Sequence, residues 1–212
     1  MRATTVTAQG QATRERIVRA AAELISERGA GGTSLDVVMA ASAVSKSQLY
    51  HYFGNKRGLV EAVVDYQCGS VLAFQADALD AVSDWDSLER WAATMVAGVE
   101  ARAGRGGCPI GTLAAALADS DESLRTSLNL AFQAWSDALH GALVRLRDNG
   151  LIVAGSDLDR LTTIMLAAIE GGLLLAKTSR DPRQLRIALD GAIDRLRAHA
   201  PTPTPTPARR RR

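Results

Sequence analysis

Apolar residues recur at three- and four-residue spacing along almost the whole chain, and alternating β-branched stretches are nearly absent. This spacing places apolar side chains on one face of an α-helix, whereas alternation is typical of strands. We therefore expect an all-α protein. Helix caps and glycine or proline breaks predict about nine helices, at residues 13–28, 34–41, 45–53, 56–81, 86–103, 109–119, 121–148, 157–179 and 182–198.

Charge is unevenly distributed along the chain. Residues 1–60 carry eight Lys and Arg against four Asp and Glu, whereas residues 61–208 carry thirteen against nineteen. A basic front end places any polyanion-binding surface at the N-terminus. Two cysteines without CxxC spacing and three histidines predict no disulfide framework, no metal site and no cofactor. No long uncharged apolar run or secretory signal is present, which indicates a cytoplasmic protein with no membrane partner.

The two short predicted helices, joined by the turn Ala41-Ser42-Ala43-Val44, have the layout of a helix-turn-helix packed on the first helix. Ser45 and Gln48 have the spacing of a capping box at the start of the second. Val44, Leu49 and Phe53 provide its apolar face. The opposite face must offer hydrogen-bond donors to a DNA major groove and its phosphates, and what remains there is Ser45, Lys46, Ser47, Gln48, Tyr50 and His51.

Residues 14–60 resemble the N-terminal DNA-binding domain of the TetR/AcrR family of bacterial transcriptional regulators, in their T-S-L start, V-S-K-S-Q-L-Y-H-Y-F helix and N-K-R-G-L segment. The resemblance implies an all-helical homodimer on a palindromic operator, usually a repressor released by a small molecule. Matched position by position, it implies base contacts from Lys46, Ser47 and Tyr50. It implies phosphate contacts from Ser34, Ser45, Gln48, His51, Tyr52 and Lys56, with packing against the first helix as the alternative for Tyr52.

Ala43 stands where many members of that family have glycine, so we expect a slightly strained turn. Farther along, CPIGTLA at 108–114 and EGGLLLA at 170–176 look similar to the LmrA/YxaF-like branch of the family.

The expected organisation has four parts. A flexible arm (1–12) precedes the helix-turn-helix domain (13–58), which is followed by an effector-binding and dimerisation domain (59–200). Residues 201–212, PTPTPTPARRRR, favour polyproline II and cannot bury a core, which predicts a disordered tail. Its four arginines are either extra phosphate contacts or simply solvated.

Small and apolar residues in the last two predicted helices suggest a four-helix dimer interface with two-fold symmetry. The alternative is that these stripes form the core of their own chain. The residues are Ile164, Ala168, Gly171, Gly172, Leu175, Leu185, Leu189, Ala192, Ile193 and Leu196.

Bulky side chains on otherwise apolar faces are candidates to line a pocket for an apolar effector, with core packing as the alternative for each. They are Trp91, Met95, Leu113, Phe132, Trp135, Met165 and Ile169. Glu170 and His140 are candidates to orient the ligand. The alternative is a DNA-binding regulator without a small-molecule effector.

Cys108 follows Arg105 and begins a predicted helix ahead of Pro109, a setting expected to lower its thiol pKa and to make it a candidate redox sensor. An ordinary small residue in a loop is the alternative. The chain has no Ser/His/Asp order, metal-ligand cluster or phosphate-binding glycine loop, so we do not expect an enzyme.

Overall fold

A computed structural model describes residues 7–201 of the chain. Within this range the fold is all-α, as predicted, and α2 to α9 begin and end within about two residues of the expected positions. Residues 1–6 of the expected arm and residues 202–212 of the expected tail, including its arginines, lie outside the described residues. The helices are α1 (Ala8–Gly32), α2 (Leu35–Ser42), α3 (Lys46–Phe53), α4 (Lys56–Asp80), α5 (Trp85–Ala101), α6 (Pro109–Leu117), α7 (Glu122–Asp148), α8 (Leu158–Ser179) and α9 (Arg183–Arg197).

The first helix begins earlier than the expected residue 13. The Thr7 hydroxyl accepts a hydrogen bond from the Gly10 N–H at 3.1 Å and caps the helix, and the Gln11 amide donates to Glu15 at 2.8 Å. Residues 8–12 are polar or small, so apolar periodicity gave no indication of this turn. At the other end Gly29 leaves helical geometry, with φ of 75°, which confirms the predicted break there.

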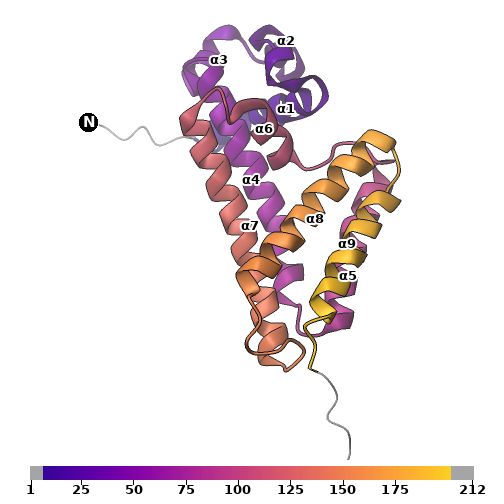
Figure 1. The fold of residues 1–212 in the computed structure, drawn as a ribbon. Helices are drawn as coiled ribbons and strands as arrows, with labels where there is room; N and C mark the ends of the chain where they lie inside the picture. Colours follow the sequence, from indigo (N-terminus) through magenta and orange to yellow (C-terminus); the bar gives the residue numbers. More distant parts are fainter. Residues whose placement is uncertain (1–6, 202–212) are drawn as a thin grey trace, which may run out of the picture.

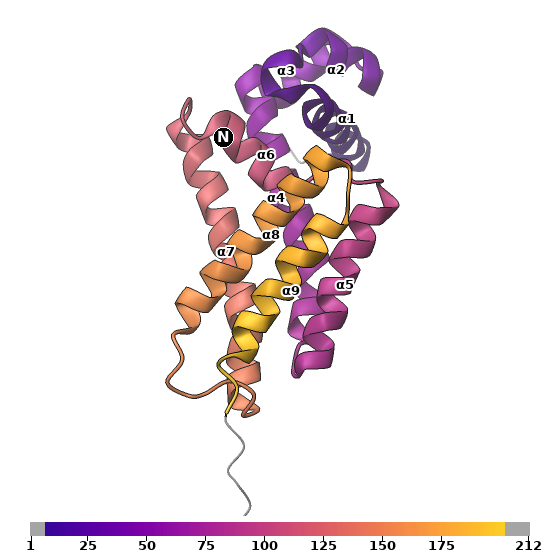
Figure 2. The same cartoon turned by 45° about the vertical axis from the view of Figure 1, so that its right-hand side comes forward.

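Helices α1 to α3 form a small domain at one end of the molecule, and α4 leads from it into the body (Figure 1). In the body α4 lies along α7, α8 packs between α7 and α9, and α5 lies against α9 (Figures 1 and 2). The short α6 contacts α1, α4 and α7. Both views therefore place α4 as the helix shared by the small domain and the body.

One described helix, α8, is apolar and long enough by composition to cross a membrane. Packing accounts for part of that composition, because Leu161, Met165 and Ile169 are buried in the core, whereas Leu174 and Leu175 are exposed on another face. Core helices of soluble proteins commonly pass the same test.

Two polar contacts fix the turn between α2 and α3. Arg16 on α1 donates to the Ser42 carbonyl at 3.0 Å, and the buried Ser42 hydroxyl donates to the Val38 carbonyl at 2.6 Å. Ala43 follows with φ of 50° and ψ of 49°, a left-handed conformation that costs a non-glycine residue about 1–2 kcal/mol. The expected strain in this turn therefore lies at Ala43.

Candidate nucleic-acid interface and ligand cavity

The start of α3 carries the predicted capping box. The Ser45 hydroxyl accepts from the Gln48 N–H at 3.2 Å, and the Gln48 side-chain oxygen accepts from the Ser45 N–H at 2.9 Å. These bonds satisfy two backbone donors that a helix start leaves free. They also use the Gln48 oxygen, so only its NH₂ group is left to donate outward.

Helix α3 has two chemically different faces. Leu49 is fully buried and Phe53 is nearly so, under the Arg14 guanidinium, which lies 5.5 Å from the ring centroid. Lys46 and Tyr50 lie together on the exposed face, with the Lys46 ammonium 5.9 Å from the Tyr50 ring. Ser47, Gln48 and His51 are exposed as well. The buried face anchors the helix, so the exposed donors have a fixed position for groove contacts.

Tyr52 lies differently from its neighbours. It is half-buried against the core, and its ring stands edge-on to His51 at 5.2 Å between centroids. This placement favours packing as its role, the alternative raised by the sequence.

The remaining predicted phosphate-contacting residues stand at the starts of other helices. The Ser34 hydroxyl caps α2 by accepting from the Val37 N–H at 3.3 Å, and Asn55 caps α4 by accepting from the Gly58 N–H at 3.0 Å. Lys56 is exposed in the first turn of α4. Helix N-termini carry positive partial charge and free N–H groups, which suit phosphate oxygens.

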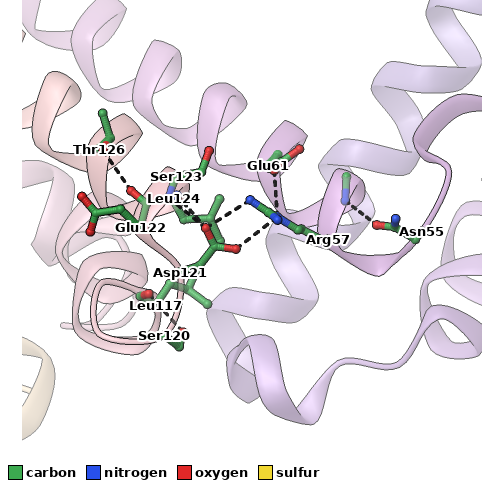
Figure 3. Close-up of polar contacts among 11 residues, drawn as sticks. Asn55, Arg57, Glu61, Leu117, Ser120, Asp121, Glu122, Ser123, Leu124 and Thr126 are labelled. Atoms are coloured by element: carbon green, nitrogen blue, oxygen red, sulfur yellow. Dashed lines mark hydrogen bonds and ion pairs between the residues drawn. The ribbon is translucent and has the colours of Figure 1, made fainter.

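The same first turn of α4 is tied to the body (Figure 3). The Arg57 guanidinium lies 3.1 Å from both Glu61 and Asp121, and it donates a second bond to Asp121 at 3.3 Å. Asp121 also caps α7 by accepting from the N–H groups of Ser123 and Leu124. Exposed pairs contribute at most about 1 kcal/mol, but this one joins the base of the small domain to the start of α7.

The body contains a cavity of about 370 Å³ lined by α1, α4, α5, α7, α8 and the loop before α6. Two of the seven predicted residues, Met95 and Trp135, line it. Leu113 lines a separate, much smaller hollow. Trp91, Met165 and Ile169 are buried in the core and Phe132 packs against it, so for these four the core alternative holds.

Sequence reasoning missed the α4 wall of the cavity, which consists of Gln67, Ser70, Val71, Phe74 and Gln75. Phe74 is 60% exposed, which is unusual for a large apolar side chain. The only indication in the sequence is the helical spacing of these residues, and polar and apolar types are mixed within it.

One polar atom in the cavity wall has no partner. Trp135 is buried and its indole N–H meets no acceptor within residues 7–201. Trp91, by contrast, donates its indole N–H to the Gln75 side chain at 2.8 Å. Buried donors are nearly always paired in proteins, so the Trp135 N–H is an exception within the described residues.

The surroundings of Cys108 correct the expectation of a lowered thiol pKa. Cys108 is buried, with its sulfur accepting from the Gly111 N–H at 3.4 Å. Burial, and then the charge of Glu170, raise the Cys108 pKa far above its ordinary value. The reactive form of cysteine is the thiolate, so the redox-sensor interpretation loses its physical basis.

The two residues suggested to orient a ligand lie outside the cavity lining. Burial raises the pKa of Glu170, and one of its carboxyl oxygens has no hydrogen-bond partner in the described part of the chain. His140 instead lies 3.3 Å from Asp159.

The predicted dimer residues divide into two groups. Gly172, Leu185, Leu189, Ala192, Ile193 and Leu196 are buried within their own chain, which supports the core alternative for these six. The reason is that α9 turns its apolar stripe toward α8 and α5 of the same chain. Gly171 and Leu175 are exposed, and Ile164 and Ala168 are half-buried, so these four remain available to a partner.

Comparison with known proteins agrees with this arrangement. Residues 17–63 match the family model for bacterial regulatory proteins of the TetR family, and residues 85–190 match the C-terminal domain of LmrA/YxaF-like transcriptional regulators. An uncharacterized helix-turn-helix regulator of Mycobacterium tuberculosis is 31% identical over 180 residues, covering 81% of this chain and 87% of the relative. The regulator LmrA of Bacillus subtilis is 28% identical over 174 residues, covering 81% and 90%.

Solved structures share the fold. A TetR family regulator from Cytophaga hutchinsonii superposes with a TM-score of 0.81 at 20% identity, covering 93% of this chain and 99% of that one. The regulator CifR, solved with double-stranded operator DNA, superposes with a TM-score of 0.74 at 21% identity, covering 86% and 95%.

Proposed function

The chain belongs to the TetR family of DNA-binding transcriptional regulators, in its LmrA/YxaF-like branch, and on this basis we propose a cytoplasmic homodimeric repressor that an apolar small molecule releases from a palindromic operator. The observation that carries the proposal is the cavity beside α4. Five residues of its wall come from the helix that also supports the small domain, so a ligand there acts on the DNA-binding helices directly.

Contact with DNA is assigned to the exposed face of α3. Lys46, Ser47 and Tyr50 reach base edges in the major groove, while Ser34, Ser45, Gln48, His51 and Lys56 contact phosphates. Tyr52 contributes by packing α3.

Dimerisation is assigned to the outer faces of α8 and α9. Leu174, Leu175 and Ile187 are 63%, 55% and 65% exposed, and the exposed Ala167 and Gly171 beside them let a second helix approach closely. Adjacent exposed leucines on a helix of a soluble protein favour an interface. Two chains joined here form a two-fold dimer, which matches an inverted repeat.

Release follows from the spacing of the two α3 helices, which must lie about 34–36 Å apart to read successive major grooves. A ligand in the cavity displaces α4, and the Arg57–Asp121 contact couples that displacement to α7. Release requires only that the ligand prefers the state in which the spacing no longer matches.

Selection of bound sequences from a random DNA library tests the dimer. We expect an inverted repeat, and a single unrepeated site would contradict the proposal. In sedimentation, the double variant Leu174→Lys/Ile187→Lys should be monomeric, whereas Leu130→Lys, which charges an exposed leucine on α7, should stay dimeric.

Screening apolar compounds against the protein–operator complex tests the effector. The variant Val71→Trp fills the cavity, so its operator affinity should no longer change when the compound is added, whether the filled protein holds the operator or not. Val153→Trp makes the same exchange at an exposed residue outside the cavity and should respond normally. Equal responses of the two variants would exclude this cavity as the effector site.

A further inference from the structure

A second hollow, of about 970 Å³, adjoins the cavity. The two share Ser26, Gln67, Ser70, Arg102 and Gly106 in their walls. We call the outer hollow the basic vestibule, because five cationic side chains line it against two carboxylates, Glu23 and Glu27. The cations are Arg19, Arg102, Arg105, Lys177 and Arg180.

None of these five cations takes part in an ion pair within residues 7–201. The polar contacts found are weak ones to backbone carbonyls, from Arg102 to Arg105 at 3.4 Å and from Arg180 to Gly104 at 3.5 Å. Arginines elsewhere in the body, such as Arg145, Arg183 and Arg197, do have carboxylate partners. The vestibule therefore holds positive charge that the protein itself does not neutralise.

Backbone packing brings these charges together. Gly104, with φ of 70°, lies so close to the end of α8 that a Cβ there would be 3.0 Å from the Ala176 carbonyl and the Arg180 backbone. The loop after α5 is thereby held on α8, with Arg102 and Arg105 near Lys177. The α8 dipole favours Lys177 at that helix end, but it does not account for the cations from α1 and from the loop after α5. Like charges gathered in this way favour a bound anion.

The inner cavity has the opposite character. Val71, Phe74, Met95, Val99 and Leu173 supply apolar walls. An apolar chamber next to a cationic vestibule fits a molecule with one apolar end and one acidic end.

We propose that the effector of this regulator is an amphipathic anion, with its apolar body in the cavity and its acidic group among the five cations of the vestibule. This inference rests on the proposed function and specifies its ligand class. It also gives the ligand a second route to the DNA-binding domain, because Arg19 belongs to α1 whereas the other four cations belong to the body.

Two fluorescent probes that differ only in an acidic group test the proposal on the full chain. Anilinonaphthalene sulfonate carries the group, and phenylnaphthylamine is the same aromatic body without it. The double variant Arg102→Gln/Arg105→Gln should weaken sulfonate binding about tenfold, as expected for lost charge-assisted contacts, and change binding of the neutral probe less than about twofold. Raising salt from about 0.05 to about 0.5 M should weaken only the sulfonate.

Controls separate the possible failures. Arg90→Gln removes an exposed arginine on α5 that lines neither hollow and should leave both probes unaffected. If the double variant does not fold, Arg19→Gln/Lys177→Gln replaces it with the same expectation. Operator affinity without probe should be unchanged in these variants, and a loss there would assign the cations to DNA and overturn the proposal.

The outcomes also distinguish this inference from the proposed function. If the double variant affects both probes equally, or if only the neutral probe binds, the proposal that the effector carries an acidic group is wrong. The proposal that the cavity binds an apolar molecule would still stand. Binding of neither probe to the native protein would overturn both.

Discussion

Replacing Ala43 by glycine should make the protein more stable, although glycine usually weakens a folded chain. Ala43 is held at φ of 50° and ψ of 49° between α2 and α3, which costs a residue with a Cβ about 1–2 kcal/mol. Glycine avoids that cost but loses about 0.5–1 kcal/mol through its more flexible unfolded chain. The expected net gain in the free energy of unfolding therefore lies between about 0 and 1.5 kcal/mol.

A matched control lies in the same short helix. Ala40 is exposed and helical, so Ala40→Gly removes no buried contact and should lose about 1 kcal/mol. Alanine-to-glycine substitution is thus expected to stabilise the protein at position 43 and to destabilise it at position 40. Urea unfolding followed by circular dichroism, at one protein concentration, measures both. If Ala43→Gly destabilises the protein as much as Ala40→Gly does, the left-handed turn and the argument from strain are both wrong.

Three further predictions concern the body. Gly172→Ala should destabilise the fold by about 1–3 kcal/mol in urea unfolding, because the new Cβ would lie 2.9 Å from the Leu185 side chain and 3.0 Å from the Leu185 backbone. The control Gly171→Ala should not destabilise the fold, because a Cβ there meets nothing within 4 Å. Gln75→Leu should cost about 1–3 kcal/mol in thermal unfolding, because it leaves the buried Trp91 N–H without its acceptor. Because burial raises the folded-state pKa of Glu170, its contribution to stability is present below the ordinary carboxyl pKa and is lost as pH rises through the raised value. Glu170→Gln should therefore gain stability relative to the native protein as pH rises from about 4 to about 8, and a constant difference between the two proteins would contradict the burial argument.

Helix caps and helix breaks could be predicted from the sequence. Ser45 caps the helix that it was expected to cap, and α1 breaks at Gly29, next to its expected end at residue 28, because each effect depends on a residue and its near neighbours alone. Thr7 was missed because a cap needs a recognisable helix after it, and AQGQA has no apolar period.

The sequence did not predict which distant helices pack against one another. Periodicity shows that α9 has an apolar face, but Leu185 and Leu189 give no indication of whether that face meets the same chain or a partner. The cavity has the same limitation, since Phe74 and Trp135 are far apart in sequence and only packing brings them into one wall. The vestibule combines Arg19, Arg102 and Lys177 from three segments. The pKa of Cys108 was misjudged because its burial depends on tertiary packing.

The most direct test of the regulator account is the affinity of the protein for its selected operator, measured with excess non-specific competitor for two double variants of identical composition. Lys46→Ala/Tyr50→Ala removes two exposed side chains of α3, and Lys177→Ala/Tyr66→Ala removes the same residue types from α8 and α4. Two lost base contacts predict about 100-fold weaker binding for the first variant, with the second within about twofold of the native protein. Equal affinities for the two variants would show that the exposed face of α3 does not read the operator.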